Sequence, residues 1–115
     1  MQYIALIYAD PANAPKYGTP EFKDMMDGYA ACTKALKDRG AWIAGEGLKP
    51  VETATAVRVR GGKTETMDGP FAETKEHLAG FYLMEVPDLD AAIKAAAMIP
   101  TASYGTIELR PVMTY

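Results

Sequence analysis

Several features that define whole classes of proteins are scarce in this 115-residue chain. Cys32 is the only cysteine, so no disulfide can close within the chain, and His77 is the only histidine. One cysteine, one histidine and scattered carboxylates do not give the ligand spacing of a metal site. No Gly-rich loop opens a predicted helix, which argues against a phosphate-binding loop. We therefore expect no metal ion and no other cofactor.

Basic charge and long hydrophobic runs are scarce as well. The chain has 12 basic and 15 acidic residues, a net charge of −3, which does not suit a surface that follows nucleic-acid phosphates. The first apolar run, residues 3–9, is too short to span a bilayer, and no basic segment precedes it. A lone cysteine is typical of a reducing compartment. These absences predict a cytoplasmic protein that binds neither nucleic acid nor membrane.

The rest of the composition is typical of a folded chain, with 49% hydrophobic and 23% charged residues. The length predicts a single domain over residues 1–115. A core of this size is modest, so burial of further surface by self-association would add stability.

Two segments carry the start and stop signals of helices. Thr19 is suited to cap a helix that begins at the next residue, a proline, and Gly40 is suited to end it. Asp88 is suited to cap a second helix that runs from Leu89 to just before Pro100. Helical spacing predicts the buried positions of both helices: Phe22, Met26, Tyr29, Thr33, Leu36, Leu89, Ile93 and Ala96.

Apolar patterns predict strands over residues 3–9, 41–48, 54–60, 63–67, 78–86 and 105–112. A Gly-Gly turn at residues 61–62 joins the third strand to the fourth. The order is β-α-β-β-(β)-β-α-β, and we interpret residues 63–67 as a short additional strand. Without it, the order predicts an α+β protein of the ferredoxin-like split βαβ plan, with an antiparallel sheet and two helices on one face.

Two of these strands, residues 3–9 and 78–86, are apolar on both alternating sets of side chains. Two helices on one face of a sheet leave the other face without cover. A second copy of the chain, packed sheet to sheet, is the economical cover. The pattern therefore predicts a homodimer.

Several motifs together carry a resemblance to a known family. The chain contains EGL at residues 46–48, DGPFAETKE at 68–76, GFY at 80–82 and ELRP at 108–111. This combination resembles the YCII-related family, in its DGPF-motif branch, over nearly the whole chain. The resemblance implies a ferredoxin-like subunit of the dimeric α/β-barrel superfamily. It implies an unsettled activity, and some relatives are encoded beside, or fused to, extracytoplasmic-function sigma factors.

One pair of residues departs from the better-known branch of that family. The core YCII branch carries a histidine on the first helix and an aspartate before the proline that ends the second. Alignment on Gly40 and Pro100 places Tyr29 near the first position and Ile99 at the second. Neither can act in an imidazole–carboxylate pair at neutral pH, so an activity that rests on this pair is unsupported here.

A polar segment before residues 78–86 holds the first candidate site. Asp68, Glu73, Lys75 and Glu76 place four ionisable side chains within nine positions, and such a cluster can hold shifted pKa values when partly buried. We take Asp68 as the first candidate for a catalytic base, with Lys75 or Glu76 as accessory ligand-binding groups. The alternatives are structural, since Asp-Gly-Pro favours a turn and exposed charge pairs are common.

The predicted strands supply further candidates for ligand binding. Arg58 shares one strand face with Arg60, and Arg110 shares one with Glu108. If such a face bounds a cavity, these charges can orient an anionic or polar ligand. Cross-strand ion pairing is the alternative. An apolar wall can form from Tyr8 together with Tyr3, Tyr29, Tyr82 and Met84, although such residues are more often plain core. We interpret His77 as non-catalytic, because it has no recognisable partner motif. Cys32 lies next to Thr33 on the apolar face of the first predicted helix, so we interpret it as a small buried or half-buried residue and not as a nucleophile.

Two functions stay open at this point. The first is a small homodimeric protein that binds a small polar or aromatic molecule in a pocket between sheet and helices. If it is an enzyme, the superfamily resemblance implies cofactor-independent chemistry such as proton transfer, isomerisation, elimination or oxygenation. The second is a non-enzymatic regulatory partner for a sigma-factor-type transcription component, which the family association alone suggests.

Overall fold

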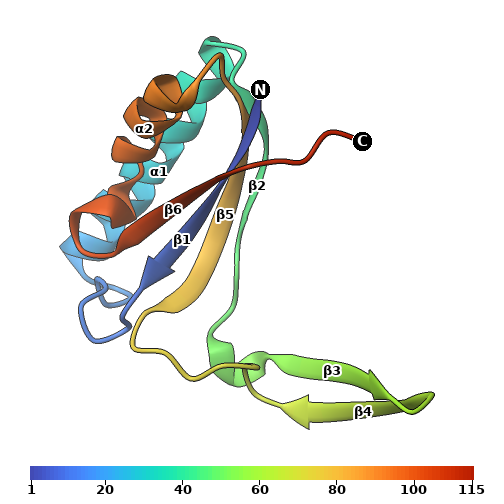
Figure 1. Ribbon diagram of the computed structural model, residues 1–115. Coiled ribbons are helices and arrows are strands. Elements are labelled where there is room, and N and C mark those ends of the chain that lie inside the picture. The colour runs from blue at the N-terminus through green and yellow to red at the C-terminus, as the bar shows by residue number, and fades with distance from the viewer.

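The computed structural model describes residues 1–115 and is organised around one four-stranded antiparallel sheet (Figure 1). Its strands lie in the spatial order β2-β5-β1-β6. Their bounds are β1 Gln2–Ala9, β2 Trp42–Gly47, β5 His77–Glu85 and β6 Thr106–Pro111. Helices α1 (Pro20–Asp38) and α2 (Leu89–Ala97) cover one face of this sheet. The α+β class and the ferredoxin-like plan are thereby confirmed.

Short elements complete the chain. Two 3-10 helices, η1 (Val51–Thr53) and η2 (Pro100–Ser103), follow β2 and α2. Two further strands, β3 (Thr55–Arg60) and β4 (Lys63–Asp68), form a separate antiparallel hairpin. Neither α1 nor α2 has the length and apolar character needed to cross a membrane.

Both helices begin where the sequence predicts. The Thr19 side chain accepts a hydrogen bond from the N–H of Phe22, and the Asp88 side chain accepts one from the N–H of Ala91. Each cap satisfies one of the backbone donors that a helix N-terminus leaves unpaired. Gly40 follows the end of α1 with a φ of +70°, a conformation that glycine adopts without steric cost.

The core lies between the sheet and the two helices. It draws on alternate residues of the central strands, on one face of each helix and on the link between α2 and η2: Tyr3, Ala5, Ile7, Tyr82, Met84, Cys32, Leu36, Ala92, Ala95 and Ile99. Because side chains alternate along a strand, the core residues of β1 and β5 all lie on one face of the sheet. Burial of each large side chain among them stabilises the fold by about 1.5–3 kcal/mol.

The predicted buried faces of the helices were partly wrong. On α1, Met26 is 51% exposed, while Cys32 and Leu36 are buried. On α2, Leu89 and Ile93 are half exposed, and the buried positions are alanines. Alanine side chains allow the helix backbone to approach the sheet closely, so the larger side chains lie outside the contact.

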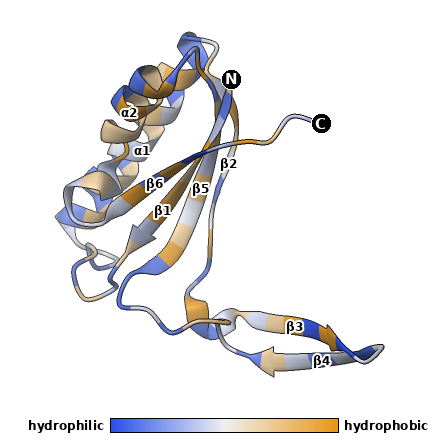
Figure 2. Cartoon of the chain, in the orientation of Figure 1, coloured by the Kyte–Doolittle hydropathy of each residue, from blue (hydrophilic) through white to orange (hydrophobic).

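The sheet face opposite the helices is uncovered in a single chain. Ile4 pairs in register with Leu83, and Leu6 pairs with Phe81, so these apolar side chains share that face. All four are only partly buried, whereas their neighbours on the helix side are fully buried. Figure 2 shows apolar colour along β1 and β5, and again on β3. The expectation that the helices leave one apolar face of the sheet open is thus confirmed. That a second copy of the chain covers this face stays a prediction.

The hairpin departs from the predicted strand plan. We expected only the strand at residues 63–67 to be additional, but β3 and β4 pair with each other and with no strand of the main sheet. The reason is local, since the tight turn at Gly61-Gly62, where both glycines have positive φ, folds β4 straight back onto β3. Leaving out both strands recovers the four-stranded plan, and the hairpin extends away from the helices (Figure 1).

Candidate functional site

A large cleft opens between α1 and the sheet. Its volume is about 1140 Å³, and 13 of its 24 lining residues are hydrophobic. The residues that matter for chemistry come from four elements: Tyr29 and Thr33 of α1, Trp42 of β2, Tyr82 of β5, and Thr101 of η2. An apolar cleft with a few convergent polar groups is the usual form of a small-molecule site.

Three aromatic rings meet in the cleft. The ring of Tyr82 packs edge to face against Trp42, with centroids 4.8 Å apart, and against Tyr29 at 6.3 Å. Gly45 makes this arrangement possible, because a Cβ there would lie 2.5 Å from the Trp42 ring and 2.8 Å from the Tyr82 ring. A glycine in a strand often marks such a close approach. The rings therefore present a preformed aromatic surface to the cleft.

Hydroxyl groups lie beside these rings in two clusters. The Tyr29 Oη and the Thr101 Oγ1 are 2.5 Å apart, and the same Thr101 oxygen is 3.2 Å from the Tyr104 Oη. The Tyr104 hydroxyl also lies 2.9 Å from the Sδ of Met25 as a donor to it. In the second cluster, the Tyr82 Oη is 3.2 Å from the hydroxyl of a threonine on α1, Thr33. The cleft thus combines an apolar wall with orientable donors and acceptors.

Burial sets the protonation state of this site. Desolvation raises the pKa of the Tyr29 and Tyr82 phenols, and their hydrogen bonds with Thr101 and Thr33 oppose that rise only in part. Burial likewise raises the pKa of the Cys32 thiol. These groups are therefore neutral near pH 7. The phenols act there as hydrogen-bonding groups, and the thiol is a small core side chain.

Charge is confined to the rim of the cleft. Lys34 and Asp38 form an exposed ion pair of 2.8 Å. Lys37 makes no ion pair, and its Nζ lies 5.7 Å from the centroid of the Trp42 ring, within cation–π range. One ammonium group is thus available next to the aromatic wall.

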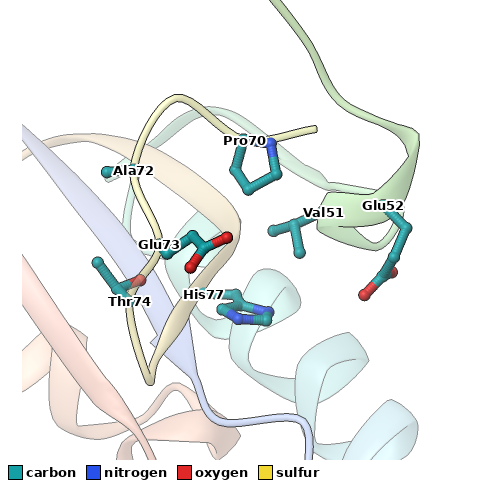
Figure 3. A pocket seen from close by; sticks show the side chains of 7 residues that line it. All are labelled: Val51, Glu52, Pro70, Ala72, Glu73, Thr74 and His77. Carbon is teal, nitrogen blue, oxygen red and sulfur yellow. The ribbon is translucent and has the colours of Figure 1, made fainter. Parts of the chain in front are cut away.

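A smaller hollow lies beside the polar segment that follows β4 (Figure 3). Its volume is about 320 Å³, and its seven lining residues include Glu52, Glu73 and His77. Figure 3 shows the Glu73 carboxylate and the His77 ring on one side of it and Glu52 on the other. No group of three or more His, Cys, Asp or Glu side chains in the chain is placed to hold a metal ion. The larger, apolar cleft is the better candidate for a small organic ligand.

The sequence-predicted site residues lie in three different places. Asp68 closes the base of the hairpin opposite Thr55. On the same hairpin, the Arg58 guanidinium lies over the Phe71 ring at 5.2 Å. Lys75 and Glu76 lie in the connection from β4 to β5, with Lys75 exposed and Glu76 half-buried. None of these four lines the cleft.

The remaining two predicted residues share the uncovered face of the sheet. Tyr8 pairs with Thr106, and Arg110 pairs with Ile4, so the alternation along β1 puts them on one side. That side is opposite the helices and therefore opposite the cleft. A ligand-binding role for any of the six predicted residues stays a prediction.

Sequence reasoning missed several groups that build the cleft. Tyr29 and Tyr82 were considered as apolar walls, but Trp42, Thr33 and Thr101 were not. The one available signal is the Trp42–Gly47 stretch, WIAGEG, which puts the single tryptophan near two glycines. From the sequence alone, glycines in a predicted strand indicate only a weak strand. Their role becomes clear once the Trp42 and Tyr82 rings are seen to occupy the space beside Gly45.

Comparison with known proteins places the chain in a family. Residues 1–115 match the YCII-related domain. The chain belongs to the YCII-related family. The YCII-related chain is also 35% identical, over 117 aligned residues, to an uncharacterized protein of Rhizobium meliloti (strain 1021). That alignment covers 100% of this chain and 94% of its relative.

Proposed function

We propose that this YCII-related protein binds a small aromatic molecule with a polar substituent in the cleft between α1 and the sheet. The observation that carries the proposal is the meeting of the rings of Tyr29, Trp42 and Tyr82 with threonine hydroxyls in one cleft. Edge-to-face and offset contacts favour a flat ligand ring. Hydroxyl groups that can rotate as donor or acceptor suit a phenol, carbonyl or carboxylate on that ring.

The same geometry limits the chemistry that the cleft can support. The Tyr29 and Tyr82 phenols stay protonated near neutral pH, because burial raises the pKa of both. Protonated phenols can stabilise negative charge on a ligand oxygen by donating hydrogen bonds to it. A cofactor-independent proton transfer would use these groups as donors, whereas binding alone needs only the aromatic wall.

A thermal-shift screen tests the binding proposal. The probes are phenol, benzoate, 4-hydroxybenzoate and 2-naphthol, measured with the parent protein and with Tyr82→Phe. A bound probe at ten times its Kd stabilises the fold by about 1.4 kcal/mol, which raises Tm by several degrees. We expect at least one probe to do so, with a smaller shift in Tyr82→Phe. If no probe raises Tm, the proposal is wrong.

The screen also tests the first sequence-based candidate for a catalytic base. Asp68 lies at the base of the hairpin and outside the cleft, so Asp68→Asn should leave every probe shift equal to that of the parent. A probe whose shift disappears in Asp68→Asn but persists in Tyr82→Phe would move the site from the cleft to the hairpin.

We propose further that two copies associate through their uncovered sheet faces. Support comes from the apolar pairs Ile4–Leu83 and Leu6–Phe81, which occupy the centre of that face and have no cover in a single chain. Facing sheets pack about 10 Å apart with interdigitated side chains. A twofold-symmetric contact uses the same patch on both copies.

A further inference from the structure

The β3–β4 hairpin stands outside the body of the molecule. The Cα radius of gyration is 16.0 Å, against about 13 Å for a compact chain of this length. No residue from Thr55 to Asp68 belongs to the buried core. Figure 1 shows the hairpin extending from the lower end of the sheet, away from the helices. The chain therefore has an L shape, with the uncovered sheet face as one inner side and the hairpin as the other.

The two faces of the hairpin differ in chemistry. Register pairs Val57 with Thr66 and Val59 with Thr64, so one face carries β-branched side chains with no charge before Asp68 at its base. We call this the neutral face. The opposite face carries the remaining residues of the hairpin: Ala56, Arg58, Arg60, Lys63, Glu65 and Met67. One face is thus suited to burial and the other to water.

The neutral face has no cover within the chain. Val57 is 62% exposed and Val59 is 58% exposed. An isolated two-stranded hairpin is marginally stable in water, and it needs packing on one face to persist. Valine and threonine favour strands because they pack well on a half-buried pleated surface. A hairpin with this pattern therefore needs a surface to pack against.

The exposed area of the chain points to a second copy as that surface. The accessible area is 7960 Å², about 1,800 Å² more than a compact monomer of the same mass exposes. Twice that excess, about 3,600 Å², lies within the range that obligate homodimers bury. The uncovered sheet face and the hairpin adjoin within one L (Figure 1), so one partner lying in the L can contact both.

We infer that the β3–β4 hairpin is an intersubunit arm, which packs its neutral face on the second copy of this chain. The inference rests on the proposed sheet-to-sheet dimer and adds a second contact to it. Twofold symmetry makes the contact reciprocal, since the arm of each copy packs on the other copy. The charged face of the arm stays in solvent at the rim, where interfaces are polar.

A matched pair of substitutions tests the arm. Val57→Gln places a polar amide on the neutral face, and Met67→Gln places the same amide on the charged face. The two parent side chains are similarly exposed in a single chain, 62% and 51%. We expect Val57→Gln to raise the dimer Kd by about tenfold or more in sedimentation velocity, because both arms lose buried apolar surface. Met67→Gln should leave the Kd within about twofold of the parent value.

Hydrogen exchange separates failure of the arm from failure of the dimer. We expect the β3 and β4 amides of the full chain to be protected at dimer-forming concentration and to exchange fast in a Phe81→Glu variant that blocks the sheet contact. A parent dimer in which both glutamine variants keep the parent Kd, with arm amides in fast exchange, overturns the arm and leaves the sheet-to-sheet dimer standing. A parent that sediments as a monomer overturns both.

Discussion

At the scale of single residues, the character of the cleft depends on a few side chains that the fold brings together from distant parts of the sequence. Trp42 and Tyr82 belong to neighbouring strands, and Tyr29 and Thr101 are joined across 72 positions by one hydrogen bond. Gly45 provides the space in which two of these rings meet. The site is thus preorganised by packing, without charged groups in its interior.

The substitution Gly45→Ala tests whether the Trp42 and Tyr82 rings need the space that a side chain at residue 45 would fill. The added Cβ would lie 2.5 Å from Trp42 and 2.8 Å from Tyr82, so the rings must shift. We expect a loss of about 1–3 kcal/mol in the free energy of unfolding, as for other overpacked sites. The control is Gly47→Ala on the same strand, where a Cβ meets nothing within 4 Å. Equal losses in both variants, measured by urea denaturation, would contradict the role given to Gly45.

The buried phenols predict how stability depends on alkaline pH. Burial raises the pKa of Tyr29 and Tyr82 above the ordinary value of 10.0. Above pH 10 the unfolded chain therefore loses these protons first, and the free energy of unfolding falls as pH rises. Below that value their contribution is fully present. Tyr82→Phe should reduce the slope, measured by denaturant titrations between pH 9 and 11; a slope unchanged from the parent would contradict this account. Tyr115→Phe, at a fully exposed ring, is the control.

At the scale of elements, local signals predicted the helices and strands well, because caps and turns depend on neighbouring residues. Thr19 and Asp88 cap the helices as expected, and the Gly61-Gly62 turn joins two strands as expected. Helical spacing did not identify which of two adjacent faces is buried, so Leu89 and Ile93 were misplaced. That choice depends on how closely the helix approaches the sheet, which no local pattern encodes.

The cleft was predictable only in outline for the same reason. A pocket between sheet and helices follows from the fold, and Tyr29 and Tyr82 follow from their positions on elements that face it. The Trp42–Tyr82 contact depends on the register of β2 against β5, which contains an irregularity after Trp42. The placement of Asp68 on a separate hairpin depends on the absence of pairing between β3 and the main sheet.

Removal of the α2 N-cap measures how much this cap contributes to the stability of the fold. Asp88→Ala deletes the side-chain acceptor that the N–H of Ala91 uses, at an expected cost of about 1 kcal/mol. Asp90→Ala, in the first turn of the same helix, removes a charge near the positive helix end but no cap, and should cost less than half as much. Thermal unfolding of both variants measures the two losses of stability. A loss in Asp90→Ala equal to or larger than that in Asp88→Ala would contradict the role given to the cap.

At the scale of the whole molecule, the uncovered sheet face links stability to self-association. Phe81 lies on that face opposite Leu6. Phe81→Ala should lower the melting temperature and weaken the dimer together, by roughly 2–5 kcal/mol if the ring is buried between two copies. Sedimentation and calorimetry measure the two effects. A parent protein that is monomeric at micromolar concentration would contradict the dimer, and a regulatory partner would then be a better cover for the face.

The most direct test of ligand binding in the cleft uses its own reporter, because Trp42 is the only tryptophan in the chain. Trp42 emission is titrated with the best probe of the thermal-shift panel, in the parent and in two matched variants. Ala30→Phe fills the cleft from α1, while Ala31→Phe adds the same ring at the next, exposed residue, which does not line the cleft. We expect a saturable change in the emission of the parent and of Ala31→Phe, and none in Ala30→Phe. An Ala30→Phe response equal to that of the parent would contradict ligand binding in the cleft.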